Sequence, residues 1–199
     1  TNTDYLWGTM IDSFKNQANG PNPAVSMVIY HALARVSFRL KRAIDYIPGS
    51  TVTTGSCSSF KVSTKQSSNS KSMRGAFKYS LSTGNLSQSS MTYDDNKVAF
   101  SSLEGHTLAQ TMGSTIGETT DFMSVMPVKG TLTVEMTVDG QAYTVTLDPY
   151  TFKAGYHYVV NLEYTGTQIN FVSGTGAAGS GMEITPWSSA GNINVKSSN

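Results

Sequence analysis

The sequence predicts an all-β protein, a Greek-key β-sandwich with very little helix, on three observations. Apolar residues recur at every second position over 24–41 and again over 131–171, which is the period of a strand with one buried face. Gly and Asx residues separate these runs as turns. Charged residues make up only 14% of the chain while Ser, Thr and Gly are abundant, a balance typical of exported β-rich proteins. We therefore expect short strands packed in two layers.

Residues 1–23 are expected to form a linker segment ahead of the sandwich. The segment closes in Asn19-Gly20-Pro21-Asn22-Pro23, where two prolines prevent a regular hydrogen-bonded ladder. Alternation of apolar and polar residues begins only after this point. We therefore place the β-sandwich domain at 24–199.

Two strands are expected between residues 24 and 41. The alternation shifts by one position near 31–33, which indicates a bulge or a crossover between two strands. His31 lies at the shift among apolar neighbours, where a structural hydrogen bond is the expected role. The alternating apolar residues are Val25, Met27 and Ile29, then Ala34, Val36, Phe38 and Leu40.

The Ser-rich middle of the chain, 50–120, gives a weaker pattern. Short strands are expected at 59–64, 76–81 and 97–100, where apolar residues recur between polar stretches.

A β-hairpin is expected over 131–147. Asp139 and Gly140 separate two alternating runs, and this pair readily adopts the positive φ angles of a two-residue type I′ turn. That turn determines the register. Three apolar pairs then share the core face: Leu132 with Leu147, Val134 with Val145, and Met136 with Tyr143.

A second hairpin is expected over 156–171, with a two-residue turn at Thr165-Gly166. This turn predicts that Leu162 faces Ile169 and that Val160 faces Phe171. Tyrosines are the residues most open to a ligand-binding role, but those at 156, 158 and 164 share the face that carries Val160 and Leu162. Core packing is the preferred interpretation.

Charge argues against nucleic acid as a partner. Fourteen basic and thirteen acidic residues give a net charge of +1, so there is no long-range field to gather a phosphate backbone. The local basic group at Arg35, Arg39, Lys41 and Arg42 is interpreted as a solvated strand face.

No cofactor, metal or catalytic centre is expected. The G-x-G-x-x-G at 174–179 precedes Gly181 and Pro186, which oppose the helix that a dinucleotide site requires. The three histidines are far apart in sequence, His157 is expected to face solvent, and Cys57 is alone, so a metal site and a disulfide are both disfavoured. No stretch approaches the ~20 apolar residues of a membrane helix.

Several segments together resemble the fimbrillin family, the pilus subunits of Bacteroidales bacteria. These segments are Asp4-Tyr5-Leu6-Trp7-Gly8, Tyr30-His31-Ala32-Leu33-Ala34-Arg35-Val36, Ala154-Gly155-Tyr156-His157-Tyr158 and Ile184-Thr185-Pro186-Trp187. Their order and spacing cover nearly the whole chain.

The resemblance implies two consecutive transthyretin-like β-sandwich domains in the whole protein, of which this chain is similar to the second. It also implies an outer-membrane-anchored lipoprotein precursor, trimmed and then polymerised at the cell surface with other pilin subunits as partners. Polymerisation would proceed by β-strand addition, in which an extended segment of one subunit completes the sheet of the next. The implied role is structural and adhesive, not enzymatic.

Two rival functions stay open: a carbohydrate-binding surface adhesin with glycans or proteins of a host or bacterial surface as partners, and a β-sandwich hydrolase. Sparse Asp and Glu argue against the hydrolase. Trp187 is expected to be anchored, because Pro186 fixes its backbone and the indole is large. Ile193 and Val195 are candidates for strand exchange, yet so short a segment is more consistent with a tip or accessory subunit than with a shaft subunit.

Overall fold

The computed structural model describes residues 6–10, 24–42, 55–80, 85–88, 97–107, 122–172, 182–187 and 192–196. Most of them form strands, and the helix in this part of the chain is one 3-10 turn at Ser101–Leu103. The strands are β1 (Leu6–Met10), β2 (Ala24–His31), β3 (Ala34–Arg42), β4 (Ser56–Gln66), β5 (Phe77–Tyr79), β6 (Leu86–Gln88), β7 (Val98–Ala99), β8 (His106–Thr107), β9 (Met123–Val125), β10 (Lys129–Val138), β11 (Gln141–Thr146), β12 (Tyr150–Thr151), β13 (Tyr156–Tyr164), β14 (Ile169–Phe171), β15 (Met182–Pro186) and β16 (Asn192–Lys196).

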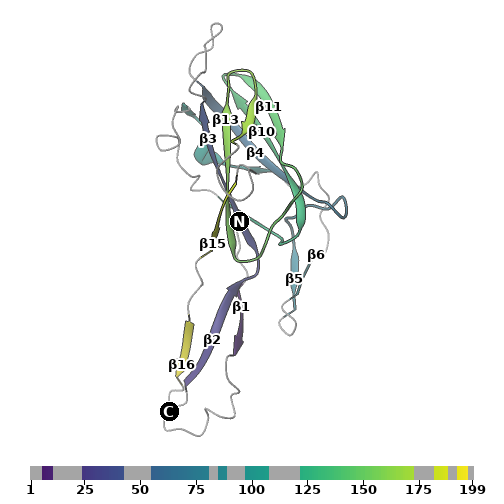
Figure 1. Cartoon of the computed structure of the whole chain (residues 1–199), viewed down its shortest axis with the longest axis vertical. Helices are drawn as coiled ribbons and strands as arrows, with labels where there is room; N and C mark the ends of the chain where they lie inside the picture. The colour runs from purple at the N-terminus through teal and green to yellow at the C-terminus, as the bar shows by residue number, and fades with distance from the viewer. Residues whose placement is uncertain are drawn as a thin grey trace.

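Two sheets form the sandwich (Figure 1). The first sheet has the order β11-β10-β4-β7, with β12 beside β10 and β8 beside β4. The second has the order β14-β13-β3-β9, with β15 beside β13. Strands far apart in sequence are neighbours, and β13 runs parallel to β3, so long crossovers join the layers as a Greek key requires. The predicted all-β sandwich with very little helix is confirmed.

The core lies between the two sheets and follows from alternation. Along β10, every second residue from Gly130 to Val138 is buried and the residues between them are partly exposed. Phe38, Phe60 and Phe100 meet at the centre, with ring centroids 5.0 to 5.8 Å apart in tilted and edge-on arrangements. Such arrangements suit the quadrupole of aromatic rings, so this cluster holds the two sheets together.

The first hairpin has the predicted register. Val134 lies opposite Val145 and Met136 opposite Tyr143 across β10 and β11. Asp139 and Gly140 have φ angles of 51° and 79°, as a type I′ turn requires.

The predicted register of the second hairpin is wrong. Leu162 lies opposite Phe171 and Tyr164 opposite Ile169, because the loop contains four residues, 165–168, in place of two. The backbone N–H of Thr165 donates to the carbonyl of Gln168 at 3.0 Å, and the Thr165 hydroxyl also bonds that residue, so the turn closes around Gly166-Thr167, one residue later than predicted. The hydrogen bonds of the Thr165 side chain therefore stabilise a different turn from the two-residue turn predicted at Thr165-Gly166.

The expected break near 31–33 separates β2 from β3, which belong to different sheets. β2 lies in a third, three-stranded sheet of order β1-β2-β16. β1 falls within 1–23, so this segment contributes a strand; the division into a linker at 1–23 and a domain at 24–199 stays a prediction. The strands expected at 59–64, 76–81 and 97–100 correspond to β4, β5 and β7.

Candidate assembly interface

A stem of three strands projects from one end of the sandwich (Figure 1). β2 is its central strand and pairs antiparallel with β1 and with β16. β1 covers Met27 to His31 of β2, whereas β16 covers Ala24 to Val28. The candidates for strand exchange lie in β16, with Ile193 opposite Met27 and Val195 opposite Val25 of the same chain.

The two outer strands of the stem are edge strands. Among the strands that the structure describes, β1 and β16 each pair with β2 alone. An edge strand presents one row of backbone N–H and C=O groups to an incoming strand. Leu6 of β1 and Tyr30 of β2 are two of the most exposed large apolar residues in the described ranges, with 48% and 45% of their surface exposed. Both lie where the stem leaves the sandwich.

An aromatic contact joins the stem to the sandwich. The ring of His31, at the end of β2, stacks on the indole of Trp187 with centroids 4.0 Å apart and planes 2° from parallel. Phe122 meets the same indole edge-on at 6.4 Å, and the guanidinium of Arg35 lies 4.1 Å over the Phe122 ring. The sequence predicted a hydrogen bond for His31; ring stacking is the contact that the structure adds to that prediction.

Backbone hydrogen bonds hold Trp187 in the same place. Its N–H donates to the carbonyl of Gly155 at 2.7 Å, and the N–H of Gly155 donates to the carbonyl of Leu33 at 3.0 Å. Gly155 has a φ of 74°, which a residue without Cβ adopts without strain. The bend between β2 and β3 is therefore tied to the end of β15, and we refer to this junction as the waist.

Replacing Trp187 by Ala is expected to lower the free energy of unfolding by about 2 to 3 kcal/mol, less than for a fully buried Trp, because the indole is only half-buried. Thermal and denaturant unfolding would measure the loss. A double-mutant cycle with His31→Ala should return a coupling of about 0.5 to 1.5 kcal/mol for the stacked pair. Unchanged unfolding curves for the single variant would contradict an anchoring role.

Asp139 has a second role besides the hairpin turn. Its carboxylate accepts hydrogen bonds from the N–H groups of Gly55 at 2.9 Å and Ser56 at 2.8 Å, and its own N–H donates to the carbonyl of Ser56. Asp139 and Gly140 thus turn the hairpin and also fasten the start of β4 to it. These are structural contacts at the end of the sandwich away from the stem.

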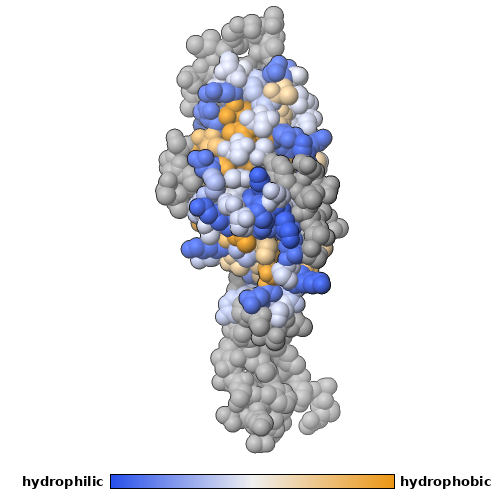
Figure 2. All heavy atoms as spheres, turned by 90° about the vertical axis from the view of Figure 1, so that its right-hand side faces the viewer, coloured by the Kyte–Doolittle hydropathy of each residue, from blue (hydrophilic) through white to orange (hydrophobic). Residues whose placement is uncertain are grey.

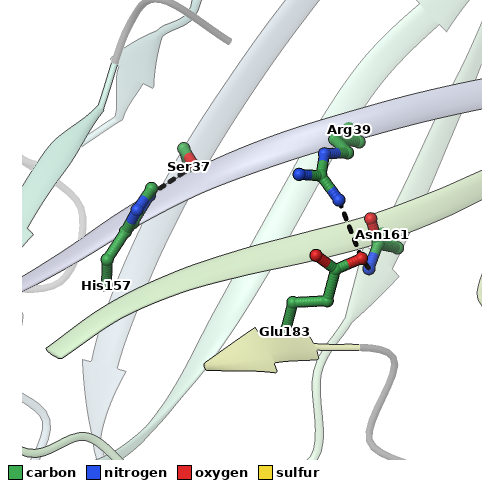
Figure 3. Close-up of polar contacts among 5 residues, drawn as sticks. All are labelled: Ser37, Arg39, His157, Asn161 and Glu183. Atoms are coloured by element: carbon green, nitrogen blue, oxygen red, sulfur yellow. Dashed lines mark hydrogen bonds and ion pairs between the residues drawn. The ribbon is translucent and has the colours of Figure 1, made fainter. Parts of the chain in front are cut away.

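A polar cluster covers the outer face of the β3-β13-β15 sheet (Figure 3). The hydroxyl of Ser37 lies 2.8 Å from Nε2 of His157. Glu183 accepts from the guanidinium of Arg39 at 2.7 Å and from the side-chain amide of Asn161 at 3.3 Å. Ser37 and Asn161 are fully buried although they face away from the core.

The cluster corrects two expectations about this face. Arg39 pairs with Glu183, and Lys41 with Glu163, so the basic residues of β3 are not simply solvated. His157 does not face solvent freely but is half-buried against Ser37. The ion pairs join β3 to β13 and β15, and so they hold β15, the strand that Trp187 follows. Because Ser37 is fully buried, its pairing with His157 leaves no access for a substrate.

Other candidate sites carry no chemistry in the part of the chain that the structure describes. Three or more potential metal-ligating side chains do not come together there, and no helix in those ranges has the length and apolar character of a membrane span. Burial raises the pKa of the Cys57 thiol to about 11, so the thiol is protonated and inert. The glycine-rich motif at 174–179 lies outside the described residues.

Comparison with known protein families decides the identity. Residues 1–187 match the fimbrillin-like family, which is nearly the full length of the chain. The chain belongs to the fimbrillin-like family. This fimbrillin-like chain is a structural, non-enzymatic protein of the pilus class, and the hydrolase alternative is set aside. No curated protein matches its sequence significantly.

Several solved structures similar to this fimbrillin-like chain come from Bacteroides species. They include a candidate cell adhesion protein from Bacteroides uniformis (12% identity, TM-score 0.49, covering 92% of this chain and 66% of that one) and another from Bacteroides ovatus (16%, 0.44, 92% and 60%). A fimbrial protein from Bacteroides vulgatus is 11% identical, with a TM-score of 0.45, covering 80% of this chain and 56% of that one. The chain thus spans about two thirds or less of these proteins.

Proposed function

We propose that the protein is a fimbrial subunit of a Bacteroides-type bacterium that assembles with other pilin subunits by β-strand addition at the outer edge of β1. The observation that supports this best is the stem, a narrow sheet held off the sandwich with β1 as one edge. An incoming strand would satisfy the backbone groups along that edge. It would also lie beside Leu6 of β1, whose exposure is otherwise unfavourable.

The waist gives the stem the rigidity that assembly needs. A partner strand gains most when the edge that it meets is already in position, because ordering a flexible edge on binding costs conformational entropy. The His31–Trp187 stack and the Gly155 hydrogen bonds hold β2 against the sandwich. β2 in turn carries β1, so the edge is ordered before a partner arrives.

Replacement of Leu6 by Lys is expected to reduce incorporation into pili by about tenfold or more, since a charge in an apolar contact readily costs the ~1.4 kcal/mol that this factor represents. Folding should be nearly unaffected, because the Leu6 side chain is exposed. The measurement is the amount of the full-length protein in pili sheared from its native host.

Ala142→Lys provides the matched control, because Ala142 is an exposed apolar residue on β11, an edge strand of the sandwich sheet that contains β10 and β4. The control should assemble normally. Normal assembly of the Leu6 variant would contradict strand addition at β1, and failure of the Ala142 variant alone would place the interface on the sandwich edge.

We also propose that the subunit is a tip or accessory component. β16 has five residues and pairs with β2 of its own chain, which supports a closing role in the stem over donation to a neighbour. Deletion of residues 192–199 from the full-length protein in its native host is expected to leave pili assembled, with the protein sparse or at their tips. Electron microscopy with labelled subunits would show this. Subunits all along the shaft, together with loss of polymerisation on deletion, would contradict the proposal.

The location and the remainder of the protein are proposed on the same basis. We propose an extracellular, surface-fimbria location reached through an outer-membrane-anchored lipoprotein precursor, with a further β-domain ahead of residue 1. Family membership supports this, as does the length of the similar structures, of which the chain covers 66% or less. The full gene sequence tests it, through the presence or absence of a lipidated cysteine and an upstream domain.

A further inference from the structure

We propose that exposed lysines beside the β4–β5 turn form a binding surface for a polyanionic glycan, a polysaccharide chain carrying sulfate or carboxylate groups. The surface consists of Lys65, Lys71, Lys78 and Lys129, all of them exposed, and is called the lysine surface below. The inference does not require strand addition, and it concerns adhesion in place of assembly.

Two of the lysines lie on the outer face of the β10-β4 sheet. Lys65 of β4 is opposite Thr131 of β10, and Lys129 is two residues further along β10. The buried and exposed residues of β10 alternate, which places Lys129 and Thr131 on the same outer face as Lys65. The N–H of Ser67 donates to the carbonyl of Lys129 at 2.9 Å, so the end of β4 is fixed beside it.

The other two lysines are carried by the turn and by the β5–β6 hairpin, which are tied to the end of β4. The N–H of Gln66 donates to the carbonyl of Lys71 at 2.9 Å. The Gln66 side chain donates to the carbonyl of Ser72 at 2.9 Å and to the side chain of Gln88 at 2.6 Å, and Gln88 donates to the carbonyl of Arg74 at 2.7 Å. Because Gln88 ends β6, these bonds hold the hairpin with Lys78 next to the turn.

The carboxylates described in the structure leave this surface with excess positive charge. Lys71, Lys78 and Lys129 form no ion pair with any of them. Asp148 is a nearby anion. It is exposed and lies between Leu147, which bonds Leu132, and Tyr150, which pairs with Gly130. The other carboxylates in the described ranges are engaged: Glu135 with Lys97, Glu163 with Lys41, Glu183 with Arg39, Asp139 with the N–H groups of Gly55 and Ser56, and Glu104 with the N–H of Phe60.

This distribution favours an external polyanion over a second copy of the chain. A second copy would have to offer an acidic surface, and the described carboxylates are mostly committed to their own cations and N–H groups. The side of the molecule that carries β5, β6 and the β4–β5 turn in Figure 1 faces the viewer in Figure 2, and strongly hydrophilic residues gather over its middle. Lysine ammonium groups act as point charges toward sulfate and carboxylate groups, which suits a long, repetitive glycan.

Binding of the whole chain to immobilised heparin, polygalacturonate and neutral dextran tests the inference. We expect binding to one or both polyanions and none to dextran, and binding should weaken as salt rises from ~0.05 to ~0.5 M because exposed charges are screened. The triple variant Lys71→Gln, Lys78→Gln, Lys129→Gln should bind about tenfold more weakly.

A charge-matched control separates the lysine surface from overall charge. Lys61→Gln, Lys97→Gln, Lys153→Gln removes the same three charges from exposed positions outside the surface, and its exposed Lys97–Glu135 pair contributes little to stability. This control should keep most of the affinity. Absence of binding to both polyanions at ~0.05 M salt, equal loss in both triple variants, or salt-sensitive self-association in place of glycan binding would each overturn the inference. None of these outcomes bears on assembly into pili, which is measured separately.

Discussion

Replacing Phe60 by Ala is expected to lower the free energy of unfolding by about 3 to 5 kcal/mol, a large part of the stability of a domain. Phe60 is fully buried on β4, and its ring meets Phe38 of the opposite sheet at 5.3 Å and Phe100 at 5.8 Å. Truncation would leave a cavity that two rigid sheets cannot close, and it would remove the edge-on ring contacts. Denaturant unfolding measures the change.

Phe77→Ala is the matched control for the core variant. Phe77 lies on the β5–β6 hairpin outside the core and is partly exposed, so its loss should cost less than about 1.5 kcal/mol. Equal costs at the two positions would show that the Phe38–Phe60–Phe100 cluster is not the centre of the fold.

Replacing Gly130 by Ala is expected to cost about 3 kcal/mol, a large penalty for one methyl group. A Cβ on Gly130 would meet the backbone carbonyl of Lys65 at 2.5 Å and would also collide with the sulfur of Met73. Met73 could move, but Lys65 belongs to the neighbouring strand and is held by the β10–β4 ladder. The substitution therefore forces the two longest strands of the sandwich apart, and thermal unfolding should show the effect.

Gly105→Ala separates this crowding from backbone strain. Gly105 has a φ of 79° and no atom within 4 Å of its added Cβ, so the cost should be only the left-handed conformation of Ala, about 1 to 2 kcal/mol. A Gly130 variant as stable as the Gly105 variant would contradict the predicted close packing of β10 on β4.

Local patterns in the sequence predicted most of the fold. Asp139-Gly140 determined its hairpin because two residues with positive φ leave a single register. Thr165-Gly166 looked equivalent, yet hydrogen bonds between Thr165 and Gln168 close that turn one residue later and change the register by two. Side-chain to backbone bonds of this kind depend on the rotamer, which alternation of apolar residues does not reveal.

Contacts between distant segments were beyond such patterns. His31 and Trp187 were each singled out as structural, but nothing in either local sequence indicated that their rings stack. Arg39 and Lys41 resembled a solvated face, because the carboxylates that meet them come from β15 and β13, whose neighbours in the sheet could not be inferred. To predict the stem, one would have to know that β1 and β16, the first and last described strands, both pair with β2.

Cross-linking in assembled pili tests most directly whether strands add at β1. A single cysteine is placed in the full-length protein either at Thr9 of β1 or at Asn194 of β16, and pili are treated with a cross-linker that reaches only an adjacent strand, ~5 Å away. Cys57 does not compete, because it is buried and its pKa is raised to about 11. The account predicts that the Thr9 variant is joined to a neighbouring subunit and that the Asn194 variant is not. Joining through Asn194 alone, or through neither position, would contradict it.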